Sequence, residues 1–253
     1  MRFKGDKNNI KRFVIRLLFL TILLLYYPIV MTYINAEHNT TVCRDVKFDV
    51  KNNNSDMLIS NDALERIFNG KFPNVKGVLL DSLQLMKKEK ELESEPVIER
   101  CEMYTTAGGV LHVEAWQREP IMRIFNSNGT SHYVDSELQI IPAKYEMRTH
   151  VVIVNGKVNI LQDTNGLLEI CKYIRENEFW RSMVEQIYVT DKMEFVLVPR
   201  VGNHVIEFGS SERMEWKFKL LYKLYTEELD KLEWNQYKKI SVKFQGQIIC
   251  TKR

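Results

Sequence analysis

Histidine and cysteine are the side chains best suited to chemistry near neutral pH, and this sequence spreads both of them thinly. The five histidines are His38, His112, His132, His150 and His204, and the four cysteines are Cys43, Cys101, Cys171 and Cys250. None of them pairs with another at the spacing of metal ligands, and no C-x-x-C is present. The sequence therefore predicts neither a metal centre nor a thioredoxin-like pair.

Signatures of enzymes are also missing. The sequence has no G-x-S-x-G, no H-E-x-x-H, no G-x-x-x-x-G-K-[ST] and no G-x-G-x-x-G. Glu176 and Glu178 are two residues apart, a spacing that does not bring side chains together on a helix. We expect no enzymatic activity and no cofactor. The alternative is a membrane-anchored exported hydrolase, whose site would be assembled from residues far apart in the sequence.

An uncharged apolar segment near the N-terminus predicts a membrane anchor. Residues 17–34 carry no charge, and residues 13–34 together exceed the ~20 residues that cross a bilayer. Lys and Arg flank only the N-terminal side, so a tail of residues 1–12 is expected in the cytoplasm and the rest outside it. A cleaved signal peptide is the alternative. The long apolar run and the poor cleavage site near Ala36 make it the weaker one.

The distribution of charge argues against a nucleic-acid partner. The net charge is +3, but residues 1–16 alone contain six Lys or Arg against one Asp. The remaining chain is therefore slightly acidic and lacks the basic footprint of a nucleic-acid-binding protein.

An exported compartment permits disulfides, and whether Cys43 and Cys101 form one is left open, because it depends on their distance in the fold.

The first exported region, residues 40–118, is predicted to be a small α+β unit with two helices on one face of a three-stranded sheet. The charged half of the second helix, KKEKELE, is expected to be a solvated surface with pairs such as Lys87–Glu91. Ser60 or Asn61 is the expected cap of the first helix. The predicted elements are a strand at 42–50, helices at 59–70 and 79–93, and strands at 97–105 and 110–120.

The second region, residues 119–253, is predicted to be rich in strands. Pro120 favours a boundary near residues 117–120, and no Gly/Ser-rich linker lies there. Met214, Phe218, Leu221 and Tyr225 lie on one face of the best predicted helix, which Ser210 or Ser211 would cap. The predicted strands are 121–126, 132–135, 146–156, 194–199 and 203–209, and the predicted helical segments are 167–187 and 211–232.

The last segment, KKISVKFQGQIICTKR, alternates apolar and polar residues from Ile240 to Cys250, which predicts one half-buried strand. Val242, Phe244 and Ile248 would form its apolar face. Because only three residues follow Cys250, this strand either lies between earlier strands or keeps an open edge that pairs with another protein.

The motifs that carry a family resemblance are E-K-E-L-E-S-E-P-V-I at 89–98, Q-R-E-P-I-M-R-I at 117–124, N-E-F-W at 177–180, P-R-V-G-N-H at 199–204, W-N-Q-Y-K-K-I at 234–240 and Q-I-I-C-T-K at 247–252. Together they resemble the cell-division protein family FtsQ (DivIB). The departures from the family pattern are Ser136-Glu137-Leu138, where a Gly-containing turn is usual, and Pro142-Ala143-Lys144.

The resemblance implies a bitopic inner-membrane protein with periplasmic POTRA and β domains. Such proteins are non-enzymatic scaffolds of the divisome that link early and late division proteins at the septum. They bind FtsB-like and FtsL-like single-pass proteins, and the FtsB tail adds to the last strand by β-augmentation. A POTRA adaptor for protein assembly or secretion is a further alternative, although such chains usually carry several POTRA units or a barrel. The partner-binding residues predicted on this basis are Tyr237, Lys239, Ile240, Ser241, Lys243, Gln245, Gln247 and Ile249.

Overall fold

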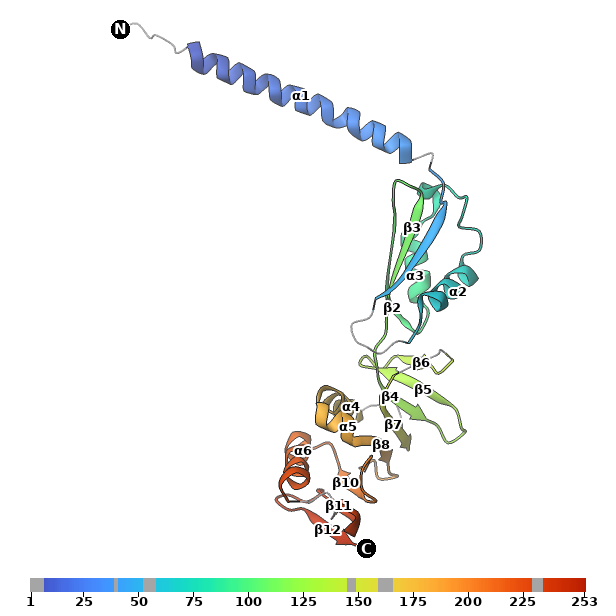
Figure 1. Cartoon of the computed structure of the whole chain (residues 1–253), viewed down its shortest axis with the longest axis vertical. Helices are drawn as coiled ribbons and strands as arrows, with labels where there is room; N and C mark the ends of the chain where they lie inside the picture. Colours follow the sequence, from blue (N-terminus) through green and yellow to red (C-terminus); the bar gives the residue numbers. More distant parts are fainter. Residues whose placement is uncertain (1–6, 39–40, 52–57, 145–148, 159–165, 229–233) are drawn as a thin grey trace, which may run out of the picture.

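The computed structural model describes residues 7–38, 41–51, 58–144, 149–158, 166–228 and 234–253 (Figure 1). A long N-terminal helix is followed by a small α+β domain and then by a strand-rich domain with helices, so the predicted α+β class is confirmed. The start of the N-terminal tail, the turn predicted after residue 51, residues 146–148 of a predicted strand and the end of the last predicted helix lie outside the described residues.

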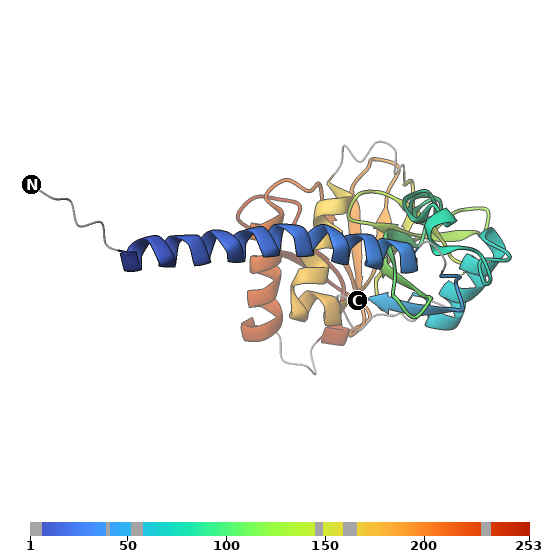
Figure 2. The same ribbon diagram turned by 90° about the horizontal axis from the view of Figure 1, so that it is seen from above.

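Helix α1, Lys7–His38, contains the predicted membrane span. Residues Ile15–Thr32 are long and apolar enough to cross a membrane, and none of this stretch is buried within the protein. Both views show its N-terminal end far from the folded domains (Figures 1 and 2). Length and composition make α1 a candidate anchor, and signal sequences pass the same test.

The first domain places two helices and a short 3-10 turn beside a three-stranded sheet of order β1-β3-β2. Strands β1 and β3 are parallel, and β2 and β3 form an antiparallel hairpin. Ser60 caps α2, because its Oγ accepts a hydrogen bond from the Ala63 amide at 3.2 Å. The bounds are β1 Asp45–Lys51, α2 Asn61–Lys71, the turn Leu80–Ser82, α3 Leu85–Glu93, β2 Ile98–Thr105 and β3 Val110–Gln117.

The predicted helix at 79–93 is wrong in its first half. A single 3-10 turn, Leu80–Ser82, is followed by Gln84 with φ +49°, a left-handed conformation that interrupts a helix. Leu80 and Leu83 are both buried. The break lets this turn place both leucines in the core, and tertiary packing therefore outweighs the helical pattern of the sequence.

Two glutamates of α3 cover the outer edge of strand β2. Glu93 Oε1 accepts a hydrogen bond from the Cys101 amide at 2.9 Å, and Glu89 Oε1 accepts one from the Met103 amide at 2.6 Å. Strand β3 occupies the other side of β2, so these amides would otherwise form an open edge. The prediction of a merely solvated surface is wrong for these two residues, and the Lys87–Glu91 pair is not among the ion pairs of the described chain.

Replacing both Glu89 and Glu93 with alanine should open this edge. Each change removes a charge-assisted hydrogen bond, which contributes roughly 1.5–3 kcal/mol where it is shielded from water. Amide hydrogen exchange at Cys101 and Met103 should therefore become at least about tenfold faster. Glu91→Ala is the matched control, because Glu91 is an exposed glutamate of the same helix. Equal protection in both variants would contradict this assignment.

The second domain is built on a nine-stranded sheet of order β12-β11-β10-β9-β8-β7-β4-β5-β6. Helices α4 Leu167–Glu176, α5 Glu178–Met183 and α6 Met214–Lys223 lie beside it (Figure 1) and pack on its core side chains. The strands are β4 Pro120–Phe125, β5 Ser131–Asp135, β6 Ile140–Pro142, β7 Val152–Gly156, β8 Val184–Val189, β9 Phe195–Pro199, β10 Val205–Gly209, β11 Tyr237–Ser241 and β12 Ile249–Lys252.

The predicted helical segment at 167–187 divides into two helices and a strand. Asn177 ends α4 and caps α5, with its Oδ1 accepting from the Trp180 amide at 3.3 Å. The chain then forms β8, which lies between β7 and β9 in the sheet. A short apolar segment such as Val184–Val189 fits either a buried helix or a buried strand by its pattern alone, and pairing on both sides decides for the strand.

Helix α6 has the predicted buried face but not the predicted cap. Phe218, Leu221 and Tyr225 are buried, as its spacing indicates. The helix starts after Arg213, which has φ +53° and offers no side-chain cap, and it ends in a π-helical turn, Leu224–Glu228. Ser211 therefore lies outside the capping position.

The two domains are joined by only two residues, between the end of β3 and the start of β4. Gln117 Oε1 accepts hydrogen bonds from the amides of Leu58 and Ile59, at 2.9 and 3.4 Å. Arg118 Nη1 lies 3.0 Å from Asp135 Oδ2, in the second domain. These bonds hold the connection against both domains.

No disulfide joins the four cysteines. Cys43 and Cys101 both lie in the core of the first domain, and both are free thiols. Burial, with the nearby charges of Glu89 and Glu93, raises the pKa of Cys101 to about 12. Its thiol therefore stays protonated at neutral pH and is unreactive.

Candidate functional site

The segment predicted as one terminal strand forms two. Strands β11 and β12 pair antiparallel, and the turn between them contains Gly246 with φ +76°, a conformation that favours glycine. Ile240 and Cys250 are direct cross-strand partners and so share one face of the sheet. The apolar and polar residues therefore alternate across the turn between β11 and β12 as they would in a single strand. Phe244, predicted on the apolar face, is 53% exposed at the turn.

Strand β11 is an inner strand, flanked by β10 and β12. Two of the predicted partner-binding residues, Ile240 and Ser241, are buried there. Tyr237 is partly buried and packs on the core of the domain. The side chains of Ile240 and Ser241 therefore belong to the interior of this protein and are not presented to a partner.

Both predicted lysines form ion pairs with glutamates of the same domain. Lys239 Nζ lies 3.1 Å from Glu207 Oε1, and Lys243 Nζ lies 2.6 Å from Glu194 Oε2. Gln245 and Gln247 are exposed residues that lie between the two strands. Of the predicted set, Ile249 alone lies in the edge strand, and its side chain is 42% exposed.

Strand β12 forms one edge of the nine-stranded sheet, and its backbone polarity follows from one hydrogen bond. The Arg253 amide donates to the Gln236 carbonyl at 3.0 Å, so it points toward β11. Successive residues of a strand direct their amides to opposite sides. The amides of Lys252 and Cys250 therefore point outward, and that of Thr251 points inward.

Cys250 and Lys252 are edge residues outside the predicted partner-binding set. The Cys250 thiol is directed to the core side and packs near Tyr225, and burial raises the pKa of both groups. The Lys252 side chain is exposed. Their role depends on backbone direction, and Gly246 is the signal in the sequence that would have placed the reversal.

The opposite edge of the same sheet is strand β6. Its central residue, Ile141, is fully buried and packs with the core of the first domain. Its last residue is Pro142, which has no amide N–H to offer. Among the described strands of this sheet, β12 is thus the edge better suited to accept another strand. The described residues contain no cluster of metal-ligating side chains.

Two family models match the sequence. The model described as FtsQ/DivIB, C-terminal related, matches residues 119–251, which is more than half of the chain. The model of the POTRA-like domain matches residues 41–116. No curated protein matches the chain.

Proposed function

The chain belongs to the FtsQ/DivIB family, and from this premise we propose that it is a membrane-anchored scaffold of the divisome. In this proposal it has no enzymatic activity. It holds an FtsB-like and an FtsL-like single-pass protein at the septum and so connects early with late division proteins. The observation that carries the proposal is the open edge of β12, with two outward amides at the end of the chain farthest from α1 (Figure 1).

The binding mode is strand addition. The amides of Cys250 and Lys252 would donate to carbonyl groups of the incoming strand, extending the sheet by one strand. Ile249 would give that strand an exposed apolar side chain on the face opposite the helices. Lys239 and Lys243 already have intramolecular partners, so Lys252 is the lysine best placed to favour an acidic residue in the partner.

Co-purification tests this proposal. The full chain, extracted in detergent, should retain an FtsB-like single-pass protein that mass spectrometry identifies. A chain that lacks residues 247–253 should lose it, while amide exchange in β2 and β3 stays unchanged. Equal recovery of the FtsB-like protein by both folded chains would overturn strand addition as the binding mode.

Topology gives a separate prediction. With Lys and Arg gathered before the apolar helix, the N-terminal tail should face the cytoplasm and both domains the periplasm. A fluorescent reporter that matures only in the cytoplasm should be dark when fused after Arg253 and bright when fused before Met1. Fluorescence from the C-terminal fusion would contradict both the topology and the proposed division role.

A further inference from the structure

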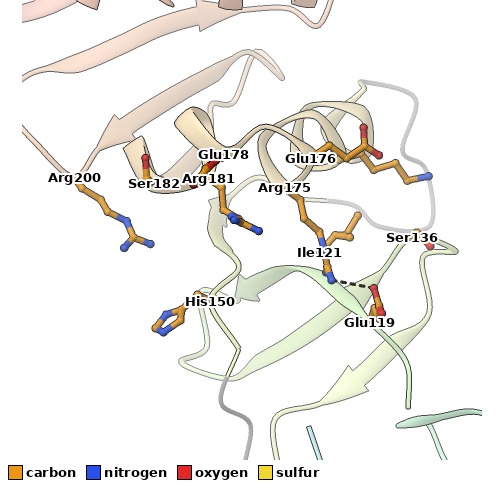
Figure 3. A pocket seen from close by; sticks show the side chains of 11 residues that line it. Glu119, Ile121, Ser136, His150, Arg175, Glu176, Glu178, Arg181, Ser182 and Arg200 are labelled. Atoms are coloured by element: carbon orange, nitrogen blue, oxygen red, sulfur yellow. Dashed lines mark hydrogen bonds and ion pairs between the residues drawn. The ribbon is translucent and has the colours of Figure 1, made fainter. Parts of the chain in front are cut away.

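A polar cleft of about 900 Å³ lies in the second domain, close to the connection with the first domain. Helices α4 and α5 form one side, and the segments around β4 and β7 form the other (Figure 3). Several cations extend into it from separate elements, namely Lys172 and Arg175 of α4, Arg181 of α5 and Arg200 after β9. This cleft is distinct from the edge strand β12, from which strands β10 and β11 separate it in the sheet.

The inner end of the cleft combines guanidinium groups with an apolar floor. A small recess of about 20 Å³ is lined by Arg175, Arg181 and Arg200 together with His150, and no carboxylate lines it. Its floor consists of the side chains of Ile121, Val152, Cys171, Ile174 and Val184. Glutamates line only the wider, outer part. Positive charge therefore gathers at the inner end of the cleft.

The three arginines differ in how they are held. Arg175 is fixed, because its Nη2 lies 3.1 Å from Glu119 Oε2 and its Nη1 donates to the Pro120 carbonyl. The guanidinium groups of Arg181 and Arg200 form no ion pair or hydrogen bond with any residue that the structure describes, and both side chains are exposed. Figure 3 shows their guanidinium groups extending toward the space between α5 and His150. Two planar forks are thus available for carboxylates.

We propose that this cleft docks an acidic, extended segment of another protein, with its carboxylates on Arg181 and Arg200. The volume lies near the upper end of the ~300–1,000 Å³ that ligand pockets span, so it holds several residues rather than one ion. The apolar floor suits aliphatic stems or apolar neighbours of the acidic residues. The body of the chain is slightly acidic, so this local excess of cations would orient such a segment.

A phosphate group fits the cleft less well. Phosphate sites commonly present backbone amides at a helix N-terminus. At α5 the Trp180 amide already donates to Asn177 Oδ1. The cleft offers guanidinium groups above an apolar floor, which matches a carboxylate on a carbon chain better than a compact phosphate group.

Binding of defined peptides tests the proposal. The full chain in a neutral detergent is titrated with fluorescein-labelled hexaglutamate and with a labelled peptide of alternating Leu and Glu. Both should bind, the alternating peptide more tightly because of the floor. Arg181→Glu combined with Arg200→Glu should weaken both by at least tenfold, and Arg181→Gln with Arg200→Gln should weaken them less.

The control carries the same change in net charge at another place. Arg66→Glu combined with Lys87→Glu reverses two exposed cations of the first domain and should leave peptide binding within about twofold of the unchanged chain. If this control weakens peptide binding equally, then the net charge of the protein explains the effect and the proposed docking site is overturned. Displacement of the peptides by inorganic phosphate at equal charge concentration would overturn the choice of a carboxylate ligand.

The outcome is separable from that of strand addition. The deletion of residues 247–253 should leave hexaglutamate binding unchanged, whereas the arginine variants should leave capture through β12 intact. Loss of both activities in either variant would indicate unfolding, which circular dichroism in the same samples reports. A folded double arginine variant with unchanged peptide affinity would refute the proposed site.

Discussion

Cys250→Pro or Lys252→Pro is expected to weaken strand addition at β12 while the domain remains folded. Proline has no N–H, and its ring occupies the edge where the partner strand must approach. An edge strand tolerates proline where the lost amide faces solvent, as we infer for Cys250 and Lys252. One lost hydrogen bond contributes about 0.5–1.5 kcal/mol. The double variant should therefore bind the FtsB-like partner roughly a hundredfold more weakly.

Matched variants separate the main chain from the side chains. Cys250→Ala and Lys252→Ala keep both amides, so partner affinity should fall by only a few fold. The Thr251 amide points in the opposite direction, toward β11. Thr251→Pro should therefore remove a bond between β11 and β12 and destabilise the hairpin itself. Affinity is measured by titration with the exported segment of the FtsB-like protein, and folding by thermal melting of the same samples.

Proline at Gln247 serves as a further control. The sequence placed Gln245 and Gln247 in the pairing strand, but both lie between β11 and β12. Gln247→Pro should consequently leave binding nearly intact. If it damages binding more than Lys252→Pro does, then the partner approaches the turn and not the edge of β12.

Periodicity predicted the elements whose burial depends on a single face. The face of α6 is an example, because Phe218 and Leu221 recur at helical spacing and both contact one core. The β2–β3 hairpin could also be predicted from the sequence, because its turn requires a glycine. Gly109 has φ +80° there, and a Cβ at this position would lie 2.6 Å from the Val42 carbonyl oxygen. Local chemistry and tertiary structure agree at these positions.

Other elements depend on neighbours that lie far away in the sequence. Strand β8 is a strand because β7 and β9 bond to both of its edges. The helical pattern of the sequence places Glu89 and Glu93 on a solvent-facing surface, whereas the structure brings β2 beside them. A single sequence contains no local signal for such pairings.

The candidate sites show the same limit. The open edge was predicted, but its position was not, since a reversal at Gly246 preserves the alternation of apolar residues. The basic cleft was not predicted at all. Arg181 and Arg200 lie on different elements and come together only because β9 returns antiparallel to β8, which follows α5.

Replacing Trp180 with alanine is the substitution expected to destabilise the second domain most. Trp180 is 1% exposed, and its ring centroid lies 4.9 Å from that of Phe218 and 6.4 Å from that of Tyr225. It thereby joins α5 to α6. Truncating a buried aromatic side chain costs about 3–5 kcal/mol. That is a large part of the ~5–15 kcal/mol by which a typical domain is stable.

Trp180→Ala should also destabilise the hairpin of β11 and β12 at the edge of the sheet. Tyr225 packs in the same core as Cys250 of β12, so loosening of the aromatic cluster removes support from the hairpin. Hydrogen exchange measured by mass spectrometry on the full chain should show loss of protection from β8 to β12, with β2 and β3 unchanged. Trp216→Ala is the control, because Trp216 lies on α6 with 37% of its surface exposed and should cost well under half as much. If the two variants lose equal protection, then Trp180 is not the centre of this core and strand addition at β12 does not depend on it.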